Sequence, residues 1–215
     1  MPVDVQKDEE KGLYYVQKEK KRLYFRKSTP AKKIQKYYRA LSMEQDRRSP
    51  HHYFNSVKEV TGKVFVDVGC AEGYSSLEII EEAKHVYLFE QDEQWLEAIR
   101  ATFEPWQDKV TIVQKYVSDH NSSREQTLDD FFNNQTNEHL FLKMDIEGAE
   151  RHALAGCNNL FQNCQKLDFA ICTYHLRDDE EVISAFLNKH NCTYINQKGF
   201  FRHKIRSVVM RGSKK

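Results

Sequence analysis

The sequence lacks any long apolar run. Of its 215 residues, 40% are hydrophobic and 30% are charged, and the mean hydropathy is -0.76. No stretch approaches the roughly 18 apolar residues of a membrane-spanning helix, and residues 1–12 are too charged for a secretion signal. We therefore expect no membrane association and a cytoplasmic location.

The sequence also lacks closely spaced cysteines and a large net charge of either sign. The five cysteines are odd in number and include no Cys-x-x-Cys pair, which argues against a disulfide framework and a zinc knuckle. The net charge is +1, but basic residues gather between residues 7 and 39, where they alternate with aromatic residues. The length suits one domain with an extension.

Residues 1–60 differ in composition from the rest of the chain. Ile34, Tyr37, Tyr38 and Leu41 recur at helical spacing after Pro30. We predict that residues 1–60 form a basic helical N-terminal extension, which serves as a lid or as the arm of a homodimer. Residues 61–215 are predicted to form the catalytic domain.

From residue 63 onward, short apolar runs alternate with helical patterns. The runs at 64–68, 86–89, 110–113, 140–144 and 167–172 have the composition of buried strands, and residues 74–80, 95–103, 149–155 and 182–187 have helical spacing. This alternation predicts an α/β fold with a doubly wound, mainly parallel sheet. The β-like runs at 192–196 and 206–210, with a short glycine-containing turn between them, predict an antiparallel edge hairpin.

A glycine loop, residues 67–73, follows the first of these strands, where open α/β sheets bind their ligands. Its spacing is G-x-x-x-G and not the G-x-G-x-x-G of dinucleotide sites. Glu72 would also repel a pyrophosphate at the helix N-terminus. S-adenosylmethionine has no phosphate and carries two cationic groups, and Glu90, at the end of the second strand, can accept hydrogen bonds from its ribose.

We therefore predict a site for S-adenosylmethionine at this end of the sheet. The alternative is that Asp67 and Glu90 are ordinary loop acids. The predicted cofactor-binding residues are Asp67, Gly69, Cys70, Ala71, Glu72, Gly73, Tyr74, Glu90, Gln91, Ser118 and Asp145.

A second acidic segment, residues 145–150, follows the fourth strand. Asp145 lies at the carboxyl end of that strand, across the topological switch from the first strand, so it is expected near the transferring methyl group. Glu147 and Glu150 are expected in the first turn of the next helix, where the helix dipole stabilises carboxylates. We assign Glu150 that structural role and leave Glu147 open between the two roles.

Methyl transfer to a hydroxyl also requires that the hydroxyl lose its proton. His175, after the fifth strand, is a candidate general base because an imidazole titrates near neutral pH. Asp145 is the rival base, or a ligand of a divalent ion together with Glu147, although we predict no metal. The predicted catalytic residues are Asp145, His175 and Glu147.

Several segments resemble the FkbM family of S-adenosylmethionine-dependent O-methyltransferases over about residues 60–190. They are VFVDVGCAEGYSSL, Glu90, TLDDF at 127–131 and LKMDIEGAE at 142–150. The resemblance implies a seven-stranded Rossmann-like methyltransferase fold, with Asp67, Gly69, Gly73 and Glu90 on the cofactor and Asp145 in the site. It also implies O-methylation of a hydroxyl on a sugar or other small molecule.

Three other functions stay open at this point. The basic and aromatic residues between 18 and 39 would suit an RNA or other nucleic-acid methyltransferase, although we favour a solvated helix face there. A non-catalytic cofactor-binding scaffold is the second alternative. A nicotinamide oxidoreductase is the third.

Overall fold

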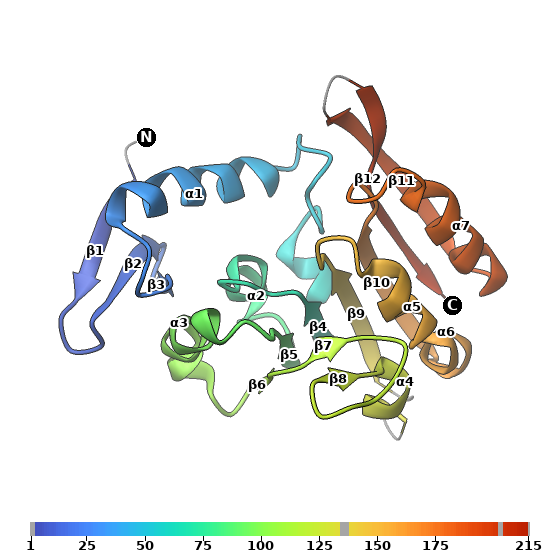
Figure 1. Cartoon of the computed structure of the whole chain (residues 1–215), viewed down its shortest axis with the longest axis horizontal. Helices are drawn as coiled ribbons and strands as arrows, with labels where there is room; N and C mark the ends of the chain where they lie inside the picture. Colours follow the sequence, from blue (N-terminus) through green and yellow to red (C-terminus); the bar gives the residue numbers. More distant parts are fainter. Residues whose placement is uncertain (1–2, 134–137, 202–203, 215) are drawn as a thin grey trace.

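The computed structural model describes residues 3–133, 138–201 and 204–214. Its centre is a seven-stranded sheet in the order β11-β12-β10-β9-β4-β5-β6 (Figure 1). The seven strands are β4 (Val64–Val68), β5 (His85–Phe89), β6 (Val110–Val113), β9 (His139–Met144), β10 (Lys166–Cys172), β11 (Thr193–Phe201) and β12 (Lys204–Lys214).

The sheet is mainly parallel, as predicted. Strands β6, β5, β4, β9 and β10 pair in parallel, whereas β12 is antiparallel to both β10 and β11. The edge hairpin is therefore confirmed, but Gly199 lies inside β11 opposite Arg206 and not in the turn. Residues 197–201 and 204–205 of the predicted turn belong to the two strands, and residues 202–203 lie outside the described residues.

The chain winds outward from β4 in both directions, so a topological switch lies between β4 and β9. All five residues of β4 are buried, as expected for a strand that is covered on both faces. Phe65 packs in one hydrophobic cluster, and its neighbours Val64 and Val66 pack in the other, because alternate side chains of a strand point to opposite faces.

Helices cover both faces of this sheet. Helices α2 (Tyr74–Ile79) and α3 (Glu93–Phe103) contribute to the cluster on one face. Figure 1 shows them on the same side of the molecule as the N-terminal segment. The other cluster is built from α4 (Leu128–Phe131), α5 (Glu150–Ala155), α6 (Asn158–Asn163) and α7 (Asp179–Lys189).

The N-terminal segment is not the purely helical extension that we predicted. It begins with a three-stranded antiparallel sheet made of β1 (Val5–Asp8), β2 (Leu13–Lys18) and β3 (Lys21–Tyr24). In β2, Leu13 and Tyr15 are buried and Tyr14 between them is only half-buried, which is the alternation of a strand. Only the later part is helical, in α1 (Ala31–Glu44), which begins directly after Pro30.

The same segment packs on the helices that cover one face of the main sheet. The backbone N–H of Tyr24 donates to Thr102 on α3 at 3.0 Å, and Lys21 donates to the carbonyl of Leu77 on α2 at 2.7 Å. Phe25 and Ile34 are fully buried in the cluster that also contains Phe65. The position of α1 is therefore set by the core of the protein.

The remaining elements are short. Two 3₁₀ helices, η1 (Val57–Val60) and η2 (Glu104–Trp106), precede β4 and follow α3, and a small sheet joins β7 (Tyr116–Val117) to β8 (Glu125–Gln126). Within the described ranges, none of the helices has both the length and the apolar character to span a bilayer.

Candidate active site

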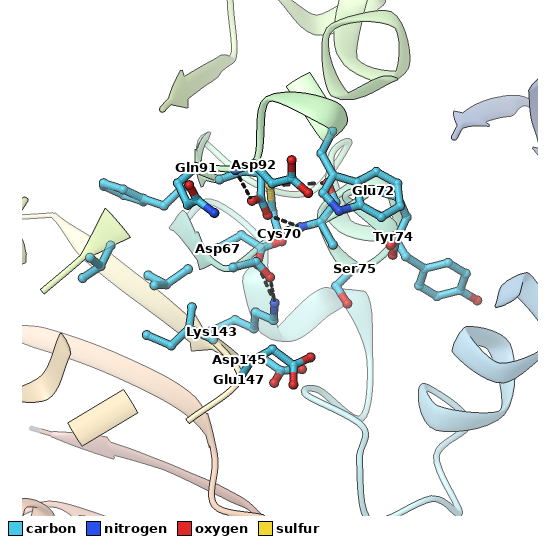
Figure 2. Close-up of a pocket in the computed structure, with 18 of the residues that line it drawn as sticks. Asp67, Cys70, Glu72, Tyr74, Ser75, Gln91, Asp92, Lys143, Asp145 and Glu147 are labelled. Atoms are coloured by element: carbon cyan, nitrogen blue, oxygen red, sulfur yellow. Dashed lines mark hydrogen bonds and ion pairs between the residues drawn. The ribbon is translucent and has the colours of Figure 1, made fainter. Parts of the chain in front are cut away.

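A cavity of about 590 Å³ opens at the carboxyl ends of β4, β5 and β9 (Figure 2). Residues of α1 line its other side. Seven carboxylates but only three basic side chains line it, so the cavity favours a cationic ligand. The acids are Glu44, Asp67, Glu72, Glu90, Asp92, Asp145 and Glu147, and the basic residues are Arg26, Lys115 and Lys143.

Two glycines allow the loop after β4 to take its path. Gly69 has a φ of 78°, and a Cβ there would lie 2.1 Å from the carbonyl oxygen of Asp145. The loop can therefore cross the end of β9 only with glycine at this position. Gly73 has a φ of 81° directly before α2, and a Cβ there would lie 2.6 Å from the ring of Phe103.

A buried lysine supports this loop from below. Lys143, on β9, lies 2.8 Å from Asp67 Oδ1 and donates to the carbonyl oxygen of Gly69 at 2.7 Å (Figure 2). Ser76 donates to the other carboxylate oxygen of Asp67 at 2.6 Å. Burial alone would lower the pKa of Lys143, but the carboxylates of Asp67 and Asp145 raise it above its ordinary value, so the lysine remains charged.

Glu90 joins the end of β5 to the same loop. Its carboxylate accepts hydrogen bonds from the backbone N–H groups of Ala71 at 3.0 Å and Asp92 at 2.8 Å. Burial raises the pKa of Glu90, while these two N–H donors lower it. Glu90 therefore lies at the rim of the cavity, on the strand end where it was expected.

Glu72 links the cavity to α1. Its side chain is buried and accepts a hydrogen bond from the Tyr37 hydroxyl at 2.7 Å. Burial raises the pKa of Glu72 to about 7. The ring of Tyr37 also stacks on Trp95 with 6.3 Å between ring centroids, so α1 closes this side of the cavity.

Asp145 is held by two tyrosines at the opposite side. Its Oδ2 accepts a hydrogen bond from the Tyr53 hydroxyl at 2.7 Å, and its Oδ1 accepts one from the Tyr174 hydroxyl at 3.4 Å. Burial raises the pKa of both tyrosines, so both hydroxyls remain protonated donors. Asp145 thus faces the cavity in a defined orientation, with its side chain 21% exposed.

His175 contacts Asp145 from behind. Its Nε2 lies 3.5 Å from Asp145 Oδ1 and 3.5 Å from Glu147 Oε2, and its Nδ1 lies 3.0 Å from Glu150 Oε1. Burial lowers the pKa of His175, but the carboxylate of Glu150, followed by Asp145 and Glu147, raises it above its ordinary value overall.

The two glutamates near His175 differ from our expectation. Glu147 is not in the first turn of a helix, because α5 begins at Glu150 and Glu147 has a φ of 56° in the left-handed region. Glu150 is in that first turn, as predicted, but it is fully buried against His175 and accepts a hydrogen bond from the Ile146 N–H at 2.8 Å.

Most of the predicted site residues meet at the cavity. Among the described residues, Gly73, Ser118 and His175 are the predicted ones that do not line it. Those that do are Asp67, Gly69, Cys70, Ala71, Glu72, Tyr74, Glu90, Gln91, Asp145 and Glu147. The sequence reasoning missed Tyr37, Tyr53 and Lys143, of which only Lys143, a charge inside an apolar strand, carried a signal.

The family of the chain is established by a match to the model of the FkbM methyltransferase domain over residues 67–195. This match covers more than half of the sequence. The chain belongs to the FkbM methyltransferase family. The resemblance found in the sequence is thereby confirmed, and the loop, Glu90 and Asp145 all lie inside the matched FkbM region.

Solved structures support the same fold. The FkbM methyltransferase from Methylobacillus flagellatus KT is 19% identical with a TM-score of 0.57, and the match covers 70% of this chain but only 43% of that one. The tRNA m1G37 methyltransferase from M. jannaschii is 11% identical with a TM-score of 0.52, covering 94% of this chain and 56% of that one. No curated protein matches the sequence.

Proposed function

We propose that this FkbM-family chain transfers the methyl group of S-adenosylmethionine to a hydroxyl group on a sugar or another small molecule. The observation that carries the proposal is the acidic cavity at the switch between β4 and β9, with seven carboxylates against three basic side chains. Ligands of open α/β sheets bind at this place, and a donor with a sulfonium and an ammonium group complements its charge.

The residues around the glycine loop fit the donor in chemical terms. Glu90, which directly follows the strand next to β4, offers carboxylate oxygens to a ribose diol. Glu72 offers a carboxyl group that the positive charge of the donor would keep ionised. A pyrophosphate would meet the same two acids and be repelled. Asp67 serves differently, because Lys143 and Ser76 occupy its carboxylate and it holds the loop in place.

The acceptor hydroxyl is assigned to the side of the cavity where Asp145 lies. In the reaction an oxygen–carbon bond forms as the sulfur–carbon bond breaks, the sulfonium becomes a thioether, and the hydroxyl proton passes to the Asp145 carboxylate. Tyr53 and Tyr174 orient this carboxylate. His175 is a positioning residue in this scheme because it reaches the cavity through Asp145.

The test is methyl transfer from isotopically labelled S-adenosylmethionine to a panel of sugars and to metabolite extracts. The wild-type chain should label a hydroxyl-bearing compound, and Asp145→Asn should lose labelling while it still binds the donor in calorimetry. Undiminished labelling by Asp145→Asn would remove Asp145 from the mechanism. Labelling of nitrogen or carbon alone would overturn the choice of a hydroxyl acceptor.

A nucleic-acid substrate is the second candidate, and one observation favours it. Lys32, Lys33, Lys36 and Arg39 are exposed on α1, the helix that closes the cavity on one side. Lysine and arginine side chains neutralise phosphates, so binding would weaken steeply with salt. The test is RNA binding at a series of salt concentrations. An affinity that falls steeply with salt, and a loss of that salt dependence in the variant with Lys32, Lys33 and Lys36 changed to Glu, would favour a nucleic-acid substrate over a small molecule.

A further inference from the structure

On its Nε2 side, the imidazole of His175 faces two carboxylates and forms no hydrogen bond to either. This nitrogen is 3.5 Å from Asp145 Oδ1 and 3.5 Å from Glu147 Oε2. A hydrogen bond between charged groups would be about 2.7–2.9 Å long. In the described part of the chain neither ring nitrogen has a neighbour in hydrogen-bond geometry, although the side chain is only 9% exposed.

The other side of the imidazole is oriented by a buried carboxylate. Glu150 Oε1 lies 3.0 Å from His175 Nδ1, and the Glu150 side chain is fully buried. A carboxylate at this position favours the tautomer with the proton on Nδ1, which leaves the lone pair of Nε2 free. Histidines that bind metals are held in the same way by a carboxylate behind the ring.

The spacing of the atoms around Nε2 is that of ligands sharing one ion. Two ligand atoms about 2.1 Å from a tetrahedral centre lie roughly 3.4 Å apart, close to both 3.5 Å separations at His175. The Glu150 carboxylate, which contacts Nδ1, belongs to the same cluster, because ligand atoms of Asp145, Glu150 and His175 all lie within 4.8 Å of one another. We propose that Asp145, Glu147 and His175 bind one divalent transition-metal ion, with Glu150 orienting the imidazole.

The ligand set and its surroundings fit such an ion. The imidazole must release any proton from Nε2 when a metal binds; together with two carboxylates it then carries two negative charges, which a divalent cation balances. Mixed nitrogen and oxygen ligands suit Mn²⁺ or Zn²⁺. The Glu147 side chain is 92% exposed, so the site is open on one side. Asp145 and Glu147 line the cavity, so the ion would polarise an acceptor hydroxyl; this last role rests on the proposed function.

Metal binding is tested on the full chain, stripped of metal with a chelator and titrated with Mn²⁺ while free Mn²⁺ is followed by electron paramagnetic resonance. No donor or acceptor is added. We expect one Mn²⁺ per chain, affinity that falls more than about tenfold in Glu147→Gln, and no binding in His175→Ala. Pulsed resonance should show an imidazole nitrogen on the bound ion.

The matched control is His152→Ala. His152 lies on α5 with its side chain 71% exposed, so its loss should leave Mn²⁺ affinity unchanged. The exposed Glu147 side chain can be changed without disturbing the core. The Mn²⁺ affinity of Glu147→Gln therefore tests the proposed metal site even if His175→Ala does not fold. Absence of stoichiometric binding, full affinity in Glu147→Gln, or a bound ion without the nitrogen signal would overturn the proposal. None of these outcomes affects donor binding, which calorimetry measures separately.

Discussion

Replacement of Lys143 by Met should destabilise the protein strongly, because the lysine is the only cation paired with Asp67 in the described residues. Asp67 is 1% exposed, and Lys143 Nζ lies 2.8 Å from its carboxylate. Methionine has nearly the same length but carries no charge and cannot donate to the carbonyl of Gly69. The variant therefore leaves a buried carboxylate and a carbonyl oxygen without their partner.

The magnitude follows from the cost of an unpaired buried charge. Removing one member of a buried ion pair costs about 3–5 kcal/mol, out of a total of about 5–15 kcal/mol for a domain. For a chain of this size the midpoint of thermal unfolding should fall by roughly 6–20 °C. The loop from Gly69 to Gly73 should also lose its support, so donor affinity should fall with stability.

Urea unfolding of four proteins measures this cost: the wild type, Lys143→Met, Asp67→Asn and the double variant. The double variant removes both charges and should recover much of the stability that Lys143→Met loses, because no isolated charge remains. The reasoning fails if Lys143→Met costs less than about 1 kcal/mol, or if the two substitutions are simply additive.

Three further predictions concern the cavity. Gly69→Ala should cost more stability and more donor affinity than the matched control Gly12→Ala. Both glycines have a positive φ, but of the two only Gly69 would bring a Cβ against a backbone atom, at 2.1 Å. Equal losses of stability in urea unfolding would contradict the close approach of the loop to the end of β9. Because burial raises the pKa of Glu72 from 4.5 to about 7, the folded state holds this proton more tightly, so the free energy of unfolding should fall as pH rises between these values, by about 3 kcal/mol at most. Glu72→Gln should flatten that fall, and an unaltered pH profile would show that Glu72 does not cause it. Glu90→Ala should weaken donor binding while circular dichroism shows an intact fold, and unchanged affinity would refute its ribose role.

The sheet was predictable because its strands carry a strong local pattern. Apolar runs such as 64–68 and 140–144 became the buried strands β4 and β9. Once these strands were placed in parallel, their carboxyl ends had to lie at one edge, which brought Glu90 and Asp145 to the same cavity. The positions of these acids therefore followed from topology alone.

The N-terminal segment was harder to predict because its pattern is mixed. Aromatic and basic residues between 13 and 24 fit a strand of period two as well as a helix, and only packing of Leu13 and Leu23 on the main core decides between them. Tyr37 and Tyr53 reach the cavity from this region, and nothing in their neighbours along the chain reveals that position. The pairing of Glu150 with His175 is likewise a tertiary contact between α5 and the loop after β10.

Calorimetric titration of the full chain with S-adenosylmethionine, and with NAD in a parallel cell, tests most directly whether the acidic cavity holds a cationic, phosphate-free donor. The account predicts saturable binding of one S-adenosylmethionine per chain, weakened in Glu90→Ala, and no heat with NAD. Binding of NAD, or no binding of S-adenosylmethionine to the folded wild-type chain, would contradict it.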